Sequence, residues 1–360
     1  MESDIRRIAV NTGGGDSPGL NATIRAVVLS GIRNGWEVFG IRKGFGGLLG
    51  EGGVIPMDAD TVRGITHLGG TILGTTNRGN PFDWPLPDGG TVDRSDEILE
   101  GFDRHGFDAL ITIGGDGSLM IAQRLAEKGL PVIGVPKTID NDLAATSLTF
   151  GFHTAVQTAT EALDKLHSTA ESHERVFVVE VMGRSTGWIA LRSGIAATAD
   201  VILIPEIPYD LEKVCEKIRQ RYDIGRRFAI VVAAEGAAPR GGAASFIAPA
   251  GAGTAARYGG IAEQLAADIA VCSGYETRSL VLGHLQRGGT PVAFDRFIAL
   301  RFGAAAVRLV QEGRFGTMVA MVNDAITAVP LKEAVASIKT VDPESDAVQT
   351  AKATGISFGD

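Results

Sequence analysis

Short apolar runs recur along the chain and alternate with segments whose apolar residues follow a helical spacing. A run of four to eight β-branched or apolar residues is typical of a strand buried on both faces. The runs predicted as strands are 8–10, 109–113, 131–135, 176–181, 201–204, 228–233 and 318–322. One clear helical pattern follows Asp210, which is well placed as the N-cap. The apolar face of this helix is predicted to carry Leu211, Val214, Cys215, Ile218 and Tyr222.

The alternation of strands and helices predicts an α/β fold with parallel sheets covered by helices on both faces. In such a sheet the ligand binds beyond the carboxyl ends of the strands, so the turns after the strands are the places to search for chemistry. Glycine, aspartate and arginine gather in these turns. They read NTGGGDSPGLN after Val10, GGDGS after Ile113, PKTIDND after Val135, MGRSTG after Val181 and EG after Ala234.

The composition limits the classes of partner. The 360 residues are 44% hydrophobic and carry a formal net charge of -8, which argues against a nucleic-acid backbone or an anionic membrane surface as the main partner. No apolar signal core opens the sequence, and no run approaches the roughly 20 apolar residues of a membrane span. We therefore expect a soluble cytoplasmic protein with two lobes and a local anion site.

Three further features carry structural expectations. The two cysteines, Cys215 and Cys272, suggest neither a disulfide framework nor a metal site, and we expect both to be packing residues. The Gly/Ala-rich stretch 236–256 is predicted to be a mobile loop, either a lid or a passive insertion. From about residue 342 the sequence has no strong pattern, which predicts a partly ordered tail.

Consecutive glycines at 13–15 and 114–115 allow the backbone to approach a phosphate, and the helix that follows presents unpaired amides to it. One such turn alone is more often a tight turn without a ligand. Two of them beside acidic residues favour a phosphate site. The sequence contains no GxxxxGK[ST] motif, so it is not a P-loop protein.

Carboxylates accompany both motifs. Asp116 would repel a phosphate held by the glycines unless a cation lay between them, and Mg²⁺ is the cation that uses one or two carboxylates plus donor oxygens. In the segment KTIDND, Asp140 and Asp142 lie beside Lys137 and Thr138. A solvated turn could hold the same charges, but in phosphoryl transfer one carboxylate accepts a hydroxyl proton, and Asp140 is the central one.

The six histidines have no zinc-binding spacing, so a catalytic zinc is not expected. His284 differs from the others because it lies three residues before Arg287, although a structural role is an alternative. The arginines near predicted strand ends and glycine-rich turns favour bidentate binding of a phosphate dianion. They are Arg175, Arg184, Arg278 and Arg287.

Together, the motifs GGGDSPGLN, GGDGS, PKTIDND, SHERVFVVEVMGR and ETRSLVLGHLQRGG resemble the phosphofructokinase family, in particular its bacterial branch divided between ATP and pyrophosphate as donor. The resemblance runs from about residue 8 to about residue 303. GGDG alone also occurs in NAD kinases and diacylglycerol kinases, which TIDND, MGR and GHLQRGG exclude. The resemblance implies two Rossmann-like lobes with the active site in the cleft between them. Residues 1–151 and 286–336 would form the nucleotide and Mg²⁺ lobe, and residues 152–285 and 337–360 the fructose 6-phosphate lobe.

The resemblance also implies roles for individual residues. The nucleotide would be bound by Gly14, Arg78, Gly79, Gly115, Asp116, Gly117 and Ser118, with Asp116 also binding Mg²⁺; Arg78 is chosen over Asn77 for its charge. Asp140 would accept the C1 hydroxyl proton, assisted by Thr138, Asp142 and Lys137, while Arg184 would steady the transferring group. The sugar would be held by Thr138, Asp140, Met182, Gly183, Arg184 and Glu235, and its 6-phosphate by Arg175, Arg278, His284 and Arg287.

In this family the equivalents of Arg175 and Arg278 come from a neighbouring subunit, which implies a homo-oligomer, dimer or tetramer, and a nearly inactive monomer. The implied activity is that of an ATP-dependent 6-phosphofructokinase of glycolysis. Gly117 favours ATP because an aspartate there would repel the α-phosphate, whereas Lys137 also suits pyrophosphate. A pyrophosphate-dependent phosphotransferase is therefore the alternative, and an inactive sugar-phosphate sensor is a further one.

Overall fold

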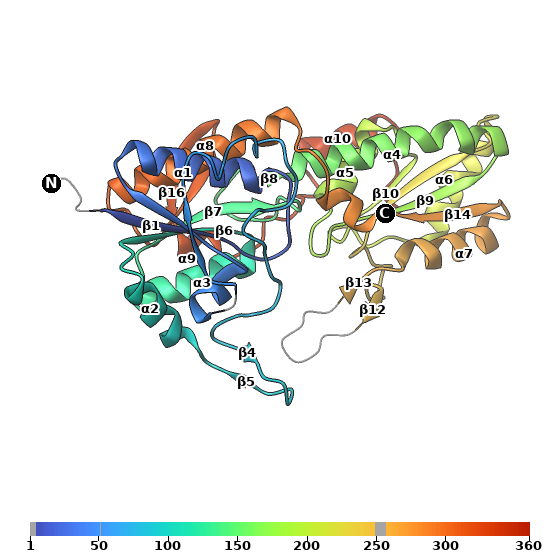
Figure 1. Ribbon diagram of the computed structural model, residues 1–360. Helices are drawn as coiled ribbons and strands as arrows, with labels where there is room; N and C mark the ends of the chain where they lie inside the picture. Colours follow the sequence, from blue (N-terminus) through green and yellow to red (C-terminus); the bar gives the residue numbers. More distant parts are fainter. Residues whose placement is uncertain (1–4, 51, 249–256) are drawn as a thin grey trace. The chain divides into compact units, whose positions relative to one another are not determined.

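The computed structural model describes residues 5–50, 52–248 and 257–360. Within them the chain divides into two compact units. The first contains the described residues up to Thr154 together with Arg287–Ile338, and the second contains the described residues from Ala155 to Gln286 together with Lys339–Asp360. Each unit has its own largely parallel sheet with helices packed on it (Figure 1), so the α/β class predicted from the sequence is confirmed.

The first unit is organised around a sheet with the strand order β16-β15-β7-β6-β1-β2-β3, in which β8 pairs beside β7. Its strands are β1 (Arg7–Thr12), β2 (Glu37–Ile41), β3 (Val54–Met57), β6 (Ala109–Gly114), β7 (Val132–Thr138), β8 (Phe150–Gly151), β15 (Thr317–Val322) and β16 (Ala325–Pro330). Only the outer pairs, β2 with β3 and β15 with β16, are antiparallel among these strands. The neighbours β1, β6 and β7 therefore all end at the same edge of the sheet.

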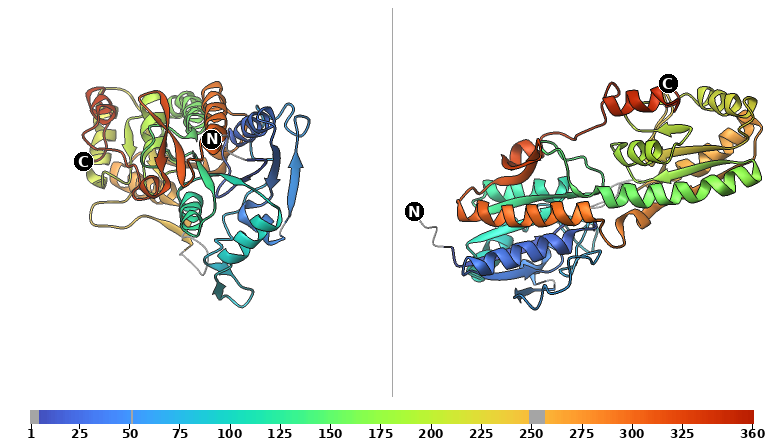
Figure 2. Two further views of the ribbon diagram at one scale, coloured as in Figure 1. Left: turned by 90° about the vertical axis from the view of Figure 1, so that its left-hand side faces the viewer. Right: turned by 90° about the horizontal axis from the view of Figure 1, so that it is seen from above.

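Helices cover both faces of this sheet. One apolar core lies under α1 (Leu20–Arg33) and α8 (Ala293–Gln311), which pack side by side, as Figure 2 shows. The opposite core lies under α2 (Ser95–Arg104), α3 (Asp116–Glu127), α9 (Leu331–Ala334) and the 3₁₀ helix η1 (Gly44–Leu49). A small antiparallel pair, β4 (Trp84–Pro85) and β5 (Thr91–Val92), lies between η1 and α2 in the chain.

The second unit has a parallel sheet of order β10-β11-β9-β14. Its strands are β9 (Val176–Val181), β10 (Val201–Leu203), β11 (Ala229–Ala234) and β14 (Thr277–Val281). The helices α6 (Leu211–Asp223) and α7 (Ile261–Ser273) share a core on one face, and α5 (Trp188–Ala196) packs against β10 and β11. The long helix α4 (Phe152–His173) begins in the first unit and continues into the second.

The strand and helix predictions follow from burial. Every residue of β11 and of β6 is buried, which is why both appear in the sequence as unbroken apolar runs. Each of the seven runs predicted as strands overlaps a strand of the structure, although residues 131, 204 and 228 fall just outside. The helix predicted after Asp210 is also confirmed as α6, because the Asp210 side chain accepts a hydrogen bond of 2.9 Å from the Glu212 backbone N–H.

The expectation that the cysteines are unbridged packing residues is wrong. Cys215 on α6 and Cys272 on the last turn of α7 form a disulfide, with their Cα atoms 6.2 Å apart. The two helices pack against each other, so residues 57 positions apart in the sequence face one another. The bridge therefore links the two helices that cover one face of the second sheet.

The prediction of an only partly ordered tail is also wrong. Residues 346–353 form α10 (Asp346–Ala353), and Ser357 forms a parallel bridge with Val201 at the edge of β10. Phe358 is fully buried. The tail is held by these few contacts, which do not repeat along the sequence and so left no periodic pattern.

Part of the Gly/Ala-rich stretch predicted as a mobile loop, 249–256, lies outside the described residues. On either side of it, β12 (Phe246–Ala248) pairs with β13 (Arg257–Tyr258) in an antiparallel ladder. Among the described residues, none of the helices has the length and apolar character needed to cross a bilayer.

We expect Phe358→Ala to lower the free energy of unfolding of the second unit by about 3–5 kcal/mol, because it leaves a cavity where a fully buried ring was. Ile224→Ala, at a position 76% exposed, is the matched control and should change it by less than about 0.5 kcal/mol. Denaturant unfolding of both variants measures this. Equal stability of the two would mean that the tail does not dock.

Candidate active site

Three turns of the first unit meet at the carboxyl edge of its sheet. The register pairs Thr12 of β1 with Ile113 of β6, and Gly114 of β6 with Pro136 of β7. The turns that follow these strands therefore emerge next to one another. The backbone N–H of Gly13 also donates to the carbonyl of Ile113 at 2.9 Å, which joins the first turn to the second strand.

The first glycine turn is narrow because other side chains approach it closely. A Cβ added to Gly13 would lie 2.5 Å from Ser118 Oγ, and one added to Gly14 would lie 3.5 Å from Lys137 Nζ. Gly14 also has a φ of 76°, which L-residues rarely adopt. Its backbone N–H donates to the carbonyl of Thr76 at 3.1 Å, so Gly14 contributes space and conformation here while its amide is occupied.

Lys137 lies buried behind this turn. Its ammonium donates to the carbonyl of Gly13 at 2.9 Å and also to the carbonyl of Gly15. Burial, and then the nearby charge of Arg287, lower the pKa of Lys137 to about 8, while neighbouring aspartates oppose this shift. The ammonium therefore stays mostly charged at neutral pH and holds two carbonyls of the turn in place.

The second turn leads into α3, whose N-cap is Gly115. The first-turn amides of a helix have no partners within the helix, so Asp116, Gly117 and Ser118 present a carboxylate and unpaired amides at one place. A Cβ added to Gly117 would meet no heavy atom within 4 Å. The space in front of Gly117 is open, whereas Ser118 is buried against the first turn.

The third turn places two carboxylates on either side of Asn141. The Asp140 backbone N–H donates to Thr138 Oγ1 at 3.1 Å, and Asn141 adopts a φ of 50°. Asn141 tolerates this conformation, and its side-chain oxygen accepts a hydrogen bond of 3.2 Å from the backbone N–H of Thr149. The Thr149 hydroxyl in turn donates to the Thr138 carbonyl at 2.7 Å. Thr149 lies seven residues beyond the motif and was not among the predicted site residues.

Electrostatics show that the carboxylates of the second and third turns interact. Burial, then the charges of Asp140 and Asp116, raise the pKa of Asp142 to about 7. Among the described residues, Asp142 Oδ1 is buried without a hydrogen-bond partner. A divalent cation beside these carboxylates would remove this repulsion, so the donor set fits Mg²⁺. The described residues contain no group of three or more metal-ligating side chains, so most ligands of such an ion would come from phosphate and water.

The segment predicted to bind the nucleotide is attached to the first turn through Thr76. Arg78 is exposed, and its backbone N–H donates to Thr76 Oγ1 at 3.0 Å. Gly79 has a φ of 96°, and a Cβ there would lie 2.9 Å from the indole of Trp84. The structure therefore brings Arg78 and Gly79 beside the glycine turn.

Arg287 also belongs to the first unit. Its Nη1 donates to the carbonyl of Asp16 at 3.1 Å, and a Cβ at Gly15 would lie 2.9 Å from the same atom. The guanidinium thus packs on the first glycine turn, and its charge contributes to the lowered pKa of Lys137.

In the second unit, another group of predicted residues gathers at the carboxyl edge of the sheet. Met182, Gly183 and Arg184 follow β9, and Glu235 follows β11, where its backbone N–H donates to the Val181 carbonyl at 2.9 Å. The buried Gln286 was not among the predicted site residues. Its side chain accepts a hydrogen bond of 3.3 Å from the Met182 N–H and donates one of 3.1 Å to the Gly283 carbonyl.

Gln286 lies in the 3₁₀ helix η2 (Gly283–Arg287), which also carries His284. The Gln286 side chain connects the turn after β9 to the start of η2, which explains the glutamine of GHLQRGG. That motif was the only sequence feature that pointed to Gln286.

Arg175 and Arg278 do not join this group within one chain. Both form ion pairs with Glu276, through Arg175 Nε at 3.0 Å and Arg278 Nη2 at 2.5 Å. Arg175 directly precedes β9, whereas Met182 and Arg184 follow that strand. A six-residue strand is about 20 Å long, so the two arginines lie at the amino edge of the sheet and the others at its carboxyl edge.

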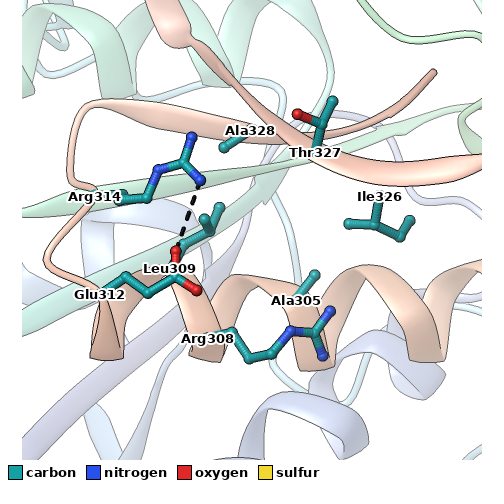
Figure 3. Close-up of a pocket in the computed structure, with 8 residues that line it drawn as sticks. All are labelled: Ala305, Arg308, Leu309, Glu312, Arg314, Ile326, Thr327 and Ala328. Carbon is teal, nitrogen blue, oxygen red and sulfur yellow. Dashed lines mark ion pairs between the residues drawn. The ribbon is translucent and has the colours of Figure 1, made fainter.

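Figure 3 shows a separate cavity of about 110 Å³ in the first unit, between α8 and β16. It contains an ion pair of 3.6 Å between Arg314 and Glu312. None of its lining residues is among the predicted site residues.

The chain is similar to several known proteins. The family model described as Phosphofructokinase matches residues 7–310. The ATP-dependent 6-phosphofructokinase 2 of Clostridium perfringens is 49% identical over 368 residues, which cover 100% of both chains. The pyrophosphate–fructose 6-phosphate 1-phosphotransferase of Amycolatopsis methanolica is 51% identical over 343 residues, 94% of this chain and 97% of that protein. Pichia pastoris phosphofructokinase, solved in the T-state, is 32% identical with a TM-score of 0.80, over 98% of this chain and 37% of that chain.

The raised pKa of Asp142 generates a prediction about stability. The folded protein holds a proton on Asp142 up to about pH 7, whereas the unfolded chain, with the ordinary pKa of 3.8, has released it. The free energy of unfolding of the wild type should therefore fall as pH rises toward 7 and level off above it. Asp142→Asn removes this dependence, so its stability relative to the wild type should rise by about 1–3 kcal/mol between pH 5 and pH 8.

Denaturant unfolding at several pH values measures this difference. Asp83→Asn, at an exposed position, is the control. A difference between Asp142→Asn and the wild type that does not change with pH would contradict the raised pKa.

Proposed function

Because the chain belongs to the phosphofructokinase family, we propose that it is an ATP-dependent 6-phosphofructokinase of glycolysis, which transfers the γ-phosphoryl group to the C1 hydroxyl of fructose 6-phosphate. The product would be fructose 1,6-bisphosphate. The observation that carries the proposal is the meeting of three turns with Lys137, Asp116, Asp140 and Asp142 at one sheet edge. Since its substrates are soluble metabolites, we propose the cytoplasm as its location.

Asp140 is proposed as the base that accepts the proton of the C1 hydroxyl. Its backbone is fixed by Thr138, and the positive φ of Asn141 separates it from Asp142. Asp142 shares the local negative potential, because burial and the charge of Asp140 both raise its pKa. Thr138 and Asp142 thus act on the base, and Lys137 acts on the glycine turn that faces the donor.

Asp116 is proposed to hold Mg²⁺ from the first turn of α3, with Asp140 and Asp142 close enough to feel its charge. When bound, Mg²⁺ supplies positive charge that offsets the charge of the phosphate oxygens. Gly115, Gly117 and Ser118 offer amides and space to the same phosphates. Gly14, Arg78 and Gly79 complete the proposed nucleotide site through their attachment at Thr76.

In the second unit, Met182, Gly183 and Glu235 are proposed to hold the sugar and Arg184 to stabilise the charge on the transferring group. The 6-phosphate is assigned to His284, Arg287, Arg175 and Arg278. His284 lies in the same short helix as Gln286, which contacts Met182, so the sugar and phosphate contacts share one support.

The choice of ATP as donor is supported by Gly117 and by relatives that match the full chain. The relative named for pyrophosphate is equally similar, so overall identity does not separate the donors. The open space in front of Gly117 has room for an α-phosphate, where a carboxylate at about 4 Å would repel it by about 4 kcal/mol at an effective dielectric constant near 20.

Two charged residues, Arg175 and Arg278, are proposed to act in the site of a neighbouring subunit. They lie beside each other at the amino edge of the second sheet, about one strand length from Arg184 of their own chain. The edge strand β14 also exposes apolar side chains, with Leu280 36% and Val281 50% exposed. We therefore propose a homo-oligomer, either a dimer or a tetramer, in which these arginines bind the 6-phosphate of the adjacent copy.

Side-by-side assays with ATP and pyrophosphate test the donor. We expect fructose 1,6-bisphosphate to form with ATP, and Gly117→Asp to lower kcat/KM for ATP by about 100-fold or more while pyrophosphate use or inhibition changes less than about tenfold. Gly117→Asn adds a side chain of similar size without a charge, so it separates charge repulsion from steric bulk. It should lower kcat/KM for ATP much less than Gly117→Asp does. Wild-type activity with pyrophosphate alone, or equal losses with both donors, would refute the choice of ATP.

Mixing two inactive variants tests the shared site. We expect Asp140→Ser and the double variant Arg175→Ala, Arg278→Ala each to be nearly inactive. In a randomly mixed dimer half of the molecules are hybrids with one intact site, so co-expression should restore about a quarter of wild-type activity.

The control pairs Asp140→Ser with Asp116→Asn, both from the first unit. A hybrid of these two has no intact site, so no activity should return. If co-expression of Asp140→Ser with the double arginine variant likewise gives only the summed activities of the two variants, the shared site is refuted. Arg175 and Arg278 then act in the active site of their own chain.

A further inference from the structure

We propose that the ring of Tyr258 positions the guanidinium of Arg184 for phosphoryl transfer, an inference that rests on the proposed function. The Arg184 guanidinium carbon lies over the Tyr258 ring, 5.0 Å from its centroid. Arg184 is exposed. Contact with the face of the aromatic ring restrains its side chain.

The chain reaches Tyr258 after leaving the sheet beside Arg184. The backbone N–H of Gly236 donates to the Gly183 carbonyl at 3.1 Å, directly after Glu235 has paired with Val181. A Cβ at Gly236 would collide with the Arg184 carbonyl oxygen, so the close approach requires glycine there. The segment that begins at Gly236 is thus packed on the backbone of Arg184. Tyr258 contacts the side chain of the same arginine.

The return of the chain is anchored to the strand that carries Arg184. Glu180 of β9 is 3% exposed, and its Oε2 accepts hydrogen bonds of 3.1 Å from the N–H groups of Gly260 and Ala262. Glu180 lies four residues before Arg184, and Gly260 lies two residues after Tyr258. The distance between the ring and the arginine is therefore set through one buried carboxylate on a rigid strand.

The other side of the Tyr258 position is supported by Phe246. The two residues are register partners in the β12–β13 ladder, and their ring centroids are 4.6 Å apart. The backbone N–H of Gly259 also donates to the Ser245 carbonyl at 3.3 Å. Tyr258 thus has a packed neighbour, and the residues that follow it are anchored at two points.

A ring beneath a guanidinium restricts its rotamers without using its N–H donors, because the donors point outward in the guanidinium plane. The Arg184 guanidinium is then already ordered when the phosphoryl group transfers. This should raise turnover more than it strengthens substrate binding. Loss of the ring should consequently lower turnover more than it weakens substrate affinity.

The test compares Tyr258→Leu with Tyr258→Phe in steady-state kinetics. Leucine keeps an apolar contact with Phe246 but has no ring face, and phenylalanine keeps the ring. We expect Tyr258→Leu to lower kcat by about three- to tenfold, with KM for fructose 6-phosphate and ATP changed by less than about twofold, and Tyr258→Phe to behave as the wild type. A kcat for Tyr258→Leu equal to that of the wild type, or a loss with Tyr258→Phe as large as with leucine, would overturn the proposal.

The Arg184→Ala background separates positioning from a general structural effect. If the ring acts through the guanidinium, adding Tyr258→Leu to Arg184→Ala should lower kcat no further. A further loss of the same size would mean that Tyr258 acts independently of Arg184 and would overturn the proposal. If Arg184→Ala itself leaves kcat unchanged, the role of Arg184 in the proposed function fails first.

Discussion

The buried ammonium of Lys137 is the contact on which the arrangement of the first unit's site depends. It holds the carbonyls of Gly13 and Gly15 from behind, and the acidic side chains of the neighbouring turns keep it charged despite its burial. An ammonium placed so deep requires compensation, because burial alone favours its neutral form. Carbonyls and carboxylates together supply it, so one charge fixes the shape of the turn and explains why aspartates gather around it.

The glycines make this contact geometrically feasible. Side chains at Gly13 or Gly14 would fill the space that Ser118 and Lys137 occupy, and a side chain at Gly15 would meet Arg287. The parallel register of three neighbouring strands then brings turns from distant parts of the chain to one edge. In the second unit the same rule gathers Met182, Gly183 and Glu235 at a carboxyl edge. Both units therefore build their candidate sites from strand ends and close backbone approach.

Much of the fold was predictable because buried parallel strands are continuous apolar runs. The strand β14 is not among the predicted apolar runs for the opposite reason, since it is an exposed edge strand with the mixed sequence TRSLV. The Cys215–Cys272 disulfide and the docking of Phe358 depend on packing between segments far apart in sequence, which leaves no local pattern.

The candidate site was predictable to a similar degree. The motifs identified the residues of each turn, and their gathering in the first unit follows from strand order. The sequence placed Arg175 and Arg184 near strand ends but did not show that they lie at opposite ends of β9. Nor did it reveal that Tyr258, beyond a Gly/Ala-rich stretch, lies against Arg184. Contacts between a long loop and a distant strand end can be identified only in the folded structure.

The most direct test of the central claim is an NMR titration of the Asp142 carboxyl group in the folded protein, with and without Mg²⁺. If the carboxylates of the two turns face one another around a cation site, the titration should give a pKa of about 7 that falls when Mg²⁺ is added. A pKa of about 4 that does not respond to Mg²⁺ would show that Asp142 is an ordinary solvated aspartate, and it would contradict the account.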